Sequence, residues 1–268
     1  MKAQGTLIII GGHEDHDGDR TILKEFAKRV QGDRVVLATV ASHEPEGYLE
    51  KYEKSLGDLG ISQVDELYVQ ERSEAMSSEK YDMLDGVSAV FFSGGDQLRI
   101  TSQIGDTPLY CRVKRIFREG GVIAGTSAGA SAMGEIMLAK GKSDSSHRLG
   151  DLHMAAGLGL VSNVIIDQHF AERGRIGRLI GAVAQNPRML GIGIDEDTAL
   201  VLQNNHFEVI GSGAVYIVDA SRVSKTNLVE GDDDEPLSVF GITMHILSQG
   251  DRFDLAHRVP EMHHRRET

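Results

Sequence analysis

Short apolar segments without polar alternation recur along the first part of this chain, and amphipathic segments separate them. The apolar segments cover residues 6–10, 35–40, 87–92 and 121–124, and residues 64–69 predict one further strand among them. Strands that are buried on both faces of a parallel sheet have this uninterrupted apolar composition. The segments between them carry apolar side chains at helical spacing over residues 23–30, 47–59 and 109–117. This alternation predicts βαβ units, and therefore an α/β fold whose mostly parallel central sheet is flanked by helices.

The second half of the chain is richer in strand patterns. Residues 164–166 and 190–194 are expected to form two further strands. Residues 199–202, 207–210 and 214–218 predict an antiparallel C-terminal β meander, with turns at Asn204-Asn205 and Gly211-Ser212-Gly213. With 268 residues, 40% of them hydrophobic, the chain is long enough for one large core, so we expect a single α/β catalytic domain over residues 1–268.

Charge and cysteine content exclude several function classes. The formal net charge of −12 makes general nucleic-acid or anionic-membrane binding unfavourable. Cys111 is the only cysteine, so no internal disulfide can form; it lies in an amphipathic segment, where we expect it to be part of the core. Because no apolar stretch is long enough to cross a membrane, we expect a cytoplasmic protein.

The segment Gly125-Thr126-Ser127-Ala128-Gly129 follows one of the predicted strands and precedes small residues that favour a helix start. Strand, Gly-x-Ser-x-Gly and helix make up a nucleophile elbow, in which glycines leave room for a tight, strained turn that projects the serine. We therefore interpret Ser127 as a candidate nucleophile. The same segment could be a glycine-rich turn with an uninvolved serine.

A serine nucleophile needs a base, and the base needs a carboxylate that orients it. His169 and Glu196 each follow a predicted strand, and the carboxyl ends of parallel strands meet at one edge of a sheet. Both are therefore expected near Ser127. The pattern does not decide between Glu196 and its neighbours Asp195 and Asp197, and a lone histidine can also be a packed or surface imidazole.

Two further groups of residues fit the same edge. An oxyanion hole needs two N–H donors, and the candidates are those of Ala128, which follows the serine, and of Gly95, in a glycine loop after a neighbouring strand. Arg173, Arg175 and Arg178 lie close together in an acidic chain. They would suit a substrate with several carboxylates, although exposed basic residues at a helix start would give the same pattern.

Together these segments resemble the cyanophycinases, within the family of serine peptidases that also contains the aspartyl dipeptidases. The matching segments are Gly11-Gly12 with Glu14-Asp15, residues 91–97, residues 125–130, residues 167–170, Arg173-Gly174-Arg175 with Arg178, and residues 193–196. The resemblance covers residues 5 to about 220. The elbow is shared by the wider family, whereas Asp-Gln-His-Phe and the arginines are more specific to cyanophycinases.

The resemblance implies a flavodoxin-like α/β sandwich related to the class I glutamine amidotransferases. It implies a serine-type exopeptidase that hydrolyses cyanophycin, a poly-aspartate with arginine on each β-carboxyl, to β-Asp-Arg dipeptides through an acyl-enzyme. Ser127 is then the nucleophile, His169 the base and Glu196 the orienting acid. The implied substrate-binding residues are Gln97, Asp167, Gln168, Arg173, Arg175 and Arg178. No metal or cofactor is implied, and such proteins are typically homodimers.

One residue departs from the resemblance, and several other functions remain open. His13 stands where a small residue is expected after Gly11-Gly12. An α-aspartyl dipeptidase of the same family would share Ser127 without needing the arginines. A metal-dependent hydrolase could use residues 13–17, which read His-Glu-Asp-His-Asp, and a non-catalytic binding module would need none of these groups. A glutamine amidotransferase is disfavoured because such enzymes have cysteine at the elbow.

Overall fold

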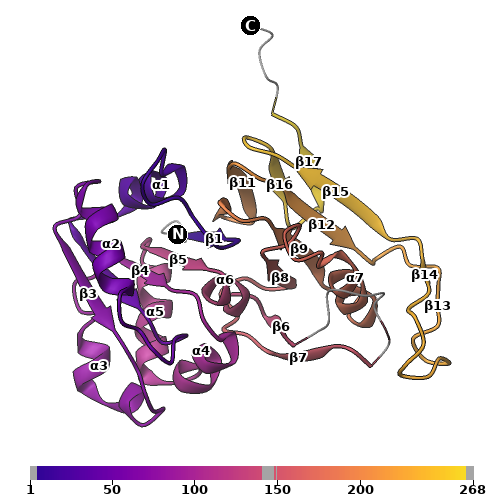
Figure 1. Cartoon of the computed structure of the whole chain (residues 1–268), viewed down its shortest axis with the longest axis horizontal. Coiled ribbons are helices and arrows are strands. Elements are labelled where there is room, and N and C mark those ends of the chain that lie inside the picture. The colour runs from indigo at the N-terminus through magenta and orange to yellow at the C-terminus, as the bar shows by residue number, and fades with distance from the viewer. Residues whose placement is uncertain (1–4, 141–147, 149, 264–268) are drawn as a thin grey trace, which may run out of the picture.

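Nine strands form the larger sheet of the computed structural model, which describes residues 5–140, 148 and 150–263 (Figure 1). Five of them run parallel, in the order β3 (Gln63–Leu67), β2 (Arg34–Ala38), β4 (Ala89–Phe92), β5 (Val122–Thr126) and β1 (Thr6–Ile10). Antiparallel strands continue the sheet beyond β1, namely β10 (Thr198–Gln203), β11 (His206–Gly211), β16 (Arg252–Asp254) and β17 (Val259–Glu261). The five parallel strands correspond to the strands predicted at residues 6–10, 35–40, 64–69, 87–92 and 121–124.

A second sheet holds the strands of the later part of the chain. Its order is β15 (Thr243–Leu247), β12 (Val215–Asp219), β9 (Leu190–Ile194), β8 (Val164–Gln168), β6 (Ile136–Lys140) and β7 (His153–Ala156). Only β6, β8 and β9 are parallel to one another. The short strands β13 (Lys225–Thr226) and β14 (Val239–Phe240) pair separately. The α/β class is thus confirmed, with two mixed sheets in place of one mostly parallel central sheet.

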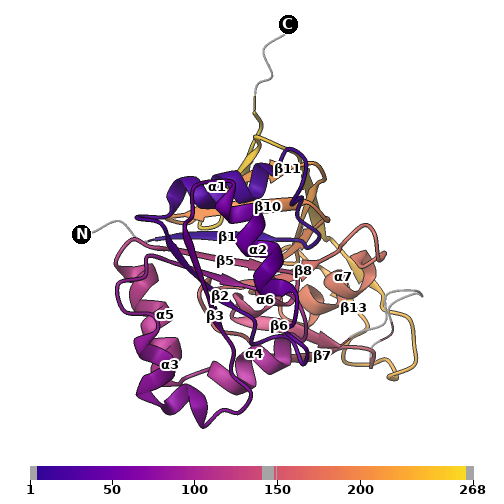
Figure 2. The ribbon, with the colours of Figure 1, turned by 60° about the vertical axis from the view of Figure 1, so that its left-hand side comes forward.

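The helices cover both faces of the larger sheet (Figure 2). Helices α1 (Thr21–Arg29) and α2 (Tyr48–Gly57) pack on one face, against residues such as Ile8 and Ile10. The opposite face, which includes Leu7 and Ile9, contacts α4 (Gln97–Ile104) and α5 (Pro108–Arg118). Because successive side chains of a strand point to opposite faces, burial on both sides explains the uninterrupted apolar runs.

The remaining helices connect the two sheets or cover the second one. The segments η1 (Glu74–Met76) and α3 (Ser78–Asp82) lie beside α5, and α6 (Ala128–Ala132) packs between β5 and β8. Helix α7 (Ile176–Gln185) packs on β9 and β8. Within the described residues, no helix is long and apolar enough to cross a membrane.

Helix α5 lies over the predicted residues 109–117, but the place of Cys111 on it differs from the prediction. Thr107 caps this helix by accepting a hydrogen bond from the Tyr110 N–H, and Pro108 stands in its first turn. Cys111, however, lies on the exposed side of α5, so its expected place in the core is wrong. The buried face of the helix is formed instead by larger apolar residues such as Leu109 and Val113.

The predicted C-terminal meander is correct for only two of its three strands. β10 and β11 form a hairpin that turns at Asn204-Asn205, both with positive φ. The third strand, β12, leaves this sheet and pairs with β9 and β15. Gly211, with φ of 108°, ends β11 where the chain crosses over; a Cβ there would lie 2.2 Å from the Asp197 carbonyl oxygen. The turn that looked like a hairpin connection is therefore a crossing between sheets.

The ends of several strands meet where the two sheets approach each other. The Ser127 N–H donates to the Ile10 carbonyl (3.0 Å), which joins the end of β5 to the end of β1. The His169 N–H, just after β8, donates to the Gly11 carbonyl (2.8 Å). The Asp197 N–H, shortly after β9, donates to the Gly12 carbonyl (2.8 Å). These backbone bonds bring loops of both sheets together at one place.

Candidate active site

Ser127 lies in a strained turn between β5 and α6. Its φ of 52° and ψ of −111° are sparsely populated for a residue with a side chain. A Cβ on Gly125 would lie 2.7 Å from the Gly129 carbonyl carbon, and one on Gly129 would lie 2.5 Å from the Phe92 carbonyl oxygen. Because neither position has room for a side chain, both glycines are needed for this turn, as the Gly-x-Ser-x-Gly pattern predicts.

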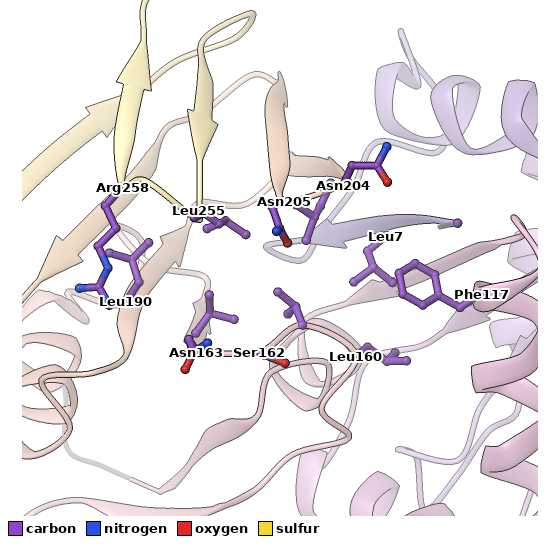
Figure 3. A pocket seen from close by; sticks show the side chains of 15 residues that line it. Leu7, Phe117, Leu160, Ser162, Asn163, Leu190, Asn204, Asn205, Leu255 and Arg258 are labelled. Carbon is purple, nitrogen blue, oxygen red and sulfur yellow. The ribbon is translucent and has the colours of Figure 1, made fainter. Parts of the chain in front are cut away.

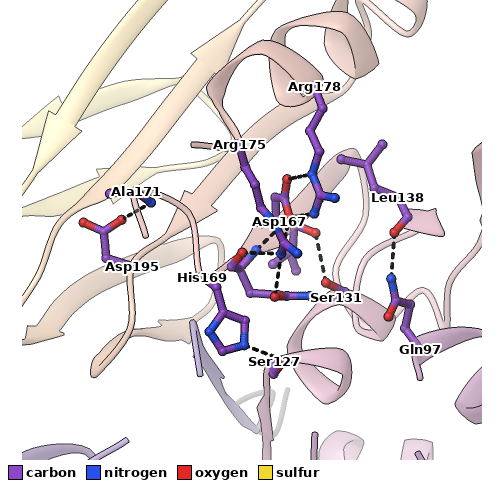
Figure 4. A network of polar contacts seen from close by, with 12 residues as sticks. Gln97, Ser127, Ser131, Leu138, Asp167, His169, Ala171, Arg175, Arg178 and Asp195 are labelled. Atoms are coloured by element: carbon purple, nitrogen blue, oxygen red, sulfur yellow. Dashed lines mark hydrogen bonds and ion pairs between the residues drawn. The ribbon is translucent and has the colours of Figure 1, made fainter. Parts of the chain in front are cut away.

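A chain of two hydrogen bonds runs from Ser127 through His169 to Glu196. Ser127 Oγ lies 2.9 Å from Nε2 of His169 (Figure 4), and Nδ1 of the same ring lies 2.6 Å from Oε1 of Glu196. A carboxylate only accepts hydrogen bonds, so Nδ1 carries the proton of the neutral ring and Nε2 is left to accept from the serine. This is the arrangement in which a serine can lose its proton to a base.

The two aspartates beside Glu196 have other partners. Asp195 accepts hydrogen bonds from the N–H groups of Ala171 (2.9 Å, Figure 4) and Ala214 (3.1 Å). Asp197 accepts from the Asp15 N–H (3.0 Å) and from the Ser212 hydroxyl (2.8 Å). Both therefore hold loops in place. Among the described residues, only the carboxylate of Glu196 bonds to the ring of His169.

The environment of His169 favours a neutral ring. Burial lowers the pKa of His169, and the positive charge of Arg173 lowers it further, against the opposing effect of Glu196. Slight burial raises the pKa of Glu196, but hydrogen bonds from His169 and His13 outweigh it, and the pKa lies below its ordinary value. At neutral pH the pair is thus an imidazole beside a carboxylate, which is the form that a general base requires.

His13 is a part of this arrangement that the sequence did not indicate. Its Nδ1 lies 2.8 Å from Oε2 of Glu196, so two imidazoles flank one carboxylate. The rings of His13 and His169 meet edge to face, with centroids 5.0 Å apart. Gly12 makes this approach possible, since a Cβ at that position would lie 2.3 Å from Cε1 of His169.

The two predicted oxyanion donors lie near Ser127. Ala128 follows it directly as the first residue of α6. A Cβ built on Gly94 would lie 3.5 Å from the Cβ of Ser127, so the loop that contains Gly95 also borders the serine. Within the described part of the chain, the N–H groups of Gly95 and Ala128 donate no hydrogen bond. Both are free to bind an oxyanion.

Asp167 and two of the arginines form a buried network next to His169 (Figure 4). Arg178 donates to both carboxylate oxygens of Asp167, at 2.6 Å from Nε, and Arg175 Nη1 lies 3.3 Å from Oδ1. Arg175 also donates to the carbonyl and to the side chain of Gln168, at 2.5 and 2.7 Å. Both arginines are thus buried and paired inside the protein, which their spacing in the sequence does not indicate.

Arg173 and Gln97 lie outside this buried network. Arg173 is exposed, and its guanidinium forms no ion pair with the described residues. Its charge nevertheless reaches His169, whose pKa it lowers. Gln97 donates from Nε2 to the Leu138 carbonyl (2.7 Å) at the far side of α6 (Figure 4). Arg173 is thus the cation of this cluster that remains available to an anionic ligand.

The side chains of residues 13–17, the His-Glu-Asp-His-Asp segment after β1, do not gather around one metal site. Glu14 is buried and accepts hydrogen bonds from the hydroxyls of Tyr52 and Thr126, the latter at 2.5 Å. Asp15 instead accepts from the backbone N–H groups of the loop that precedes α1. His16 contacts Ser55 through Nδ1 (3.0 Å), and Asp17 lies at the surface near Lys54. Of the five side chains, only those of His16 and Glu14 contact each other, with Nε2 of His16 3.4 Å from Oε1 of Glu14. The five therefore do not form the single metal site that the metal-hydrolase alternative needs.

Comparison with known proteins assigns the family. The model of Peptidase family S51 matches residues 7–210, which include the elbow, His169 and Glu196. The chain belongs to peptidase family S51. As a member of that family it is a serine-type peptidase, and thus a hydrolase.

Several S51 relatives are named Cyanophycinase. The one from Synechococcus elongatus is 39% identical over 256 residues, which covers 94% of this chain and 80% of that protein. The one from Trichormus variabilis is 41% identical over 263 residues, which covers 96% and 88% of the two chains. The one from Geminocystis herdmanii is 37% identical over 255 residues, which covers 94% of each.

Solved structures support the S51 fold. A peptidase from an acI-B1 Actinobacterium superposes with a TM-score of 0.65 at 23% identity, covering 81% of this chain and 92% of that one. A putative peptidase E protein from Listeria monocytogenes superposes with a TM-score of 0.55 at 17% identity, covering 79% and 100%. At these identities the likeness concerns the α/β sandwich itself.

A cavity of about 380 Å³ lies at the other end of the strands of this S51 peptidase (Figure 3). It is lined by residues at the start of β1, β8 and β9, such as Leu7, Val164 and Leu190. Arg258 at its rim is already bonded to Oδ1 of Asp219 (2.6 Å) and to the Arg188 carbonyl (2.5 Å). The cavity does not include Ser127, His169 or Glu196, so it is separate from the candidate active site.

Proposed function

We propose that this S51 peptidase is an exopeptidase that degrades cyanophycin to β-Asp-Arg dipeptides. The observation that carries the proposal is the hydrogen-bonded series Ser127, His169 and Glu196 at a strained elbow. It occurs in a chain that is 37–41% identical to several proteins named Cyanophycinase. The family alone would also accommodate an aspartyl dipeptidase, so the substrate rests on these relatives.

In the proposed mechanism, Ser127 Oγ attacks a backbone carbonyl carbon of the substrate while Nε2 of His169 takes the hydroxyl proton. The N–H groups of Gly95 and Ala128 stabilise the negative oxygen that forms. His169 then returns the proton to the leaving amine as the C–N bond breaks, which leaves an acyl-enzyme. A water molecule, deprotonated by His169, attacks this ester, and the Ser127 hydroxyl is restored.

Glu196 supports each of these proton transfers in the proposal. It accepts the Nδ1–H of His169 at 2.6 Å, which fixes the tautomer and the ring orientation. It also stabilises the imidazolium that forms when Nε2 takes the serine proton. Its low pKa keeps this carboxylate charged at the pH at which His169 is neutral.

Substrate binding in the proposal involves Gln97, Asp167, Gln168, Arg173, Arg175 and Arg178. The exposed guanidinium of Arg173 suits a free carboxylate of the poly-aspartate chain. Arg175 and Arg178 are held by Asp167, and Arg175 in turn holds the side chain of Gln168. We infer that this buried network fixes the shape of the binding region next to His169.

Incubation of the purified protein with insoluble cyanophycin, followed by mass spectrometry of the released products, tests the proposal. The wild type should release β-Asp-Arg, and Ser127→Ala should release none. Ser131→Ala is a matched control, since Oγ of Ser131 bonds to the Ile166 carbonyl at 3.3 Å. Turnover of small α-aspartyl dipeptides without release from cyanophycin would favour the dipeptidase alternative. Equal release by wild type and Ser127→Ala would contradict the mechanism.

We also propose that the protein is a cytoplasmic homodimer that binds neither nucleic acid nor membranes. The edge strand β15 exposes apolar side chains, Met244 and Ile246, which supports self-association. The net charge of −12 disfavours binding to nucleic acid or to anionic membranes, and the single cysteine needs no oxidising compartment. Light scattering after size-exclusion chromatography should give twice the mass of 29.2 kDa.

A further inference from the structure

His13, His169 and Glu196 bring three metal-binding side chains to one place. Their ligand atoms all lie within 4.8 Å of one another. Each imidazole turns its Nδ1 toward a different oxygen of the same carboxylate, at 2.8 Å for His13 and 2.6 Å for His169. Two imidazole nitrogens and a carboxylate oxygen are a donor set that zinc prefers, with a fourth position left for water.

We propose that these three residues form an inhibitory site for a divalent transition-metal ion such as Zn²⁺. The ion would enter from the side of His13, whose side chain is 71% exposed, and reach Glu196, which is 27% exposed. His169 is buried and supplies the ligand at the base of the site. The inhibitory effect rests on the proposed function, whereas metal binding does not.

Backbone bonds hold the three ligands close together. The loop that carries His13 accepts hydrogen bonds from the N–H of His169 at Gly11 and from the N–H of Asp197 at Gly12, both at 2.8 Å. His13 and His169 themselves have positive φ values of 49° and 46°, which fix where each ring leaves the backbone. Because the protein has already ordered these groups, an ion that replaces the two hydrogen bonds pays little further ordering entropy.

Binding at Nδ1 would remove the base from the reaction. A neutral imidazole carries one proton, so a metal on Nδ1 of His169 leaves that proton on Nε2, and the ring releases no net proton. Nε2 then donates to Ser127 Oγ, at 2.9 Å, and can no longer accept its proton. The ion would therefore block activation of the serine without contacting it.

Calorimetric titration of Ser127→Ala protein with zinc chloride tests the site without any substrate. We expect binding that weakens at least about tenfold when His13→Asn is added, since one of three ligands is lost. Asparagine accepts the positive φ of this position, so the loop is preserved. His153→Ala, at an exposed histidine, is the matched control and should leave the affinity unchanged. Equal zinc affinity with and without His13 would overturn the proposal.

The nearby charge of Arg173 offers a second test of where the ion binds. This guanidinium acts on His169 and therefore repels a cation held there. Arg173→Gln should tighten zinc binding several-fold, because it removes the repulsion. An unchanged affinity would place the ion elsewhere and contradict the proposal.

Labelling of Ser127 by a fluorophosphonate probe separates the inhibitory effect from the proposed function. Zinc should slow the labelling of wild-type protein, a chelator should restore it, and His13→Asn should be slowed about tenfold less. If metal-free wild type labels but zinc has no effect on its rate, the inhibitory role is overturned and the proposed function stands. If metal-free wild type does not label, the proposed function fails, and the titration alone decides the metal site.

Discussion

Nδ1 of His169 and Oε1 of Glu196 lie 2.6 Å apart, although the two residues are separated by 27 positions. His169 directly follows β8, and Glu196 comes shortly after the end of β9. These two strands are neighbours and run parallel, and Gln168 of β8 pairs with Ile194 of β9. The register of these strands therefore sets the distance between the imidazole and the carboxylate. This relationship allows the role of the carboxylate to be tested separately from that of the serine.

Replacement of the carboxylate by an amide should lower turnover strongly. In Glu196→Gln the side chain can donate to Nδ1 of His169, which favours the tautomer with the proton on Nε2, and this tautomer cannot accept from Ser127. We expect kcat to fall by about 10³–10⁴-fold with little change in the melting temperature. Asp197→Asn is the control, because its carboxylate bonds to the loop at Asp15 and Ser212. Similar losses in both variants would contradict the assignment of Glu196.

The pH dependence of kcat/KM should reflect the lowered pKa of His169. The ring acts as a base only when it is neutral, so kcat/KM rises as pH increases through this pKa. Burial lowers the pKa below the ordinary value of 6.5, which moves the acidic limb of the profile to lower pH. Arg173→Gln removes a charge that lowers the pKa and should move the limb back toward higher pH. A limb above 6.5 in the wild type would contradict this environment of His169.

Replacement of Arg173 and replacement of Arg178 should have different effects. Arg173→Gln removes an exposed cation without an ion pair among the described residues, so we expect a KM for cyanophycin raised about tenfold and an unchanged melting temperature. Arg178→Gln breaks a buried pair with Asp167, whose side chain is 1% exposed, and should lower the free energy of unfolding by about 3 kcal/mol. Thermal melting and steady-state kinetics on both variants make the comparison. Equal stability of the two would show that the buried network carries no stability.

Several parts of the fold and site could be predicted because their constraints are local. The tight turn at Ser127 requires glycine at positions 125 and 129, and the apolar strands require burial on both faces. The ends of these strands then had to converge, which brought the loops of His169 and Glu196 toward the serine. These predictions need only strand patterns and the geometry of parallel sheets.

Other features depend on contacts that no local pattern encodes. The bond between His13 and Glu196 joins opposite ends of the matched segment, and it needs the bare backbone of Gly12. Arg178 is buried because Asp167, on the adjacent strand, neutralises it, although an isolated arginine near a helix start would be expected at the surface. The strand β12 changes sheet after a turn that resembles an ordinary hairpin. In each case, the partner that decides the structure is distant or belongs to another sheet.

Glu14 is a buried carboxylate behind the elbow. It accepts hydrogen bonds from Tyr52 and from Thr126, the residue before the candidate nucleophile, and Nε2 of His16 lies 3.4 Å away. Burial raises the pKa of Glu14, but bonds from His16, Thr126 and Tyr52 outweigh it and lower the pKa to about 2. Glu14→Gln should therefore reduce the free energy of unfolding at neutral pH by about 2 kcal/mol.

The pH dependence of this loss distinguishes the charge of Glu14 from its shape. A carboxyl whose pKa is lower in the folded state contributes its stability fully above its unfolded value of 4.5, and the contribution is lost as pH falls toward about 2. The difference in unfolding free energy between wild type and Glu14→Gln should thus shrink over this range in denaturant titrations. Glu50→Gln, at an exposed position of α2, is the control and should differ little from wild type at any pH. A difference that stays constant down to pH 3 would mean that packing at this position, and not the buried charge, supports the elbow.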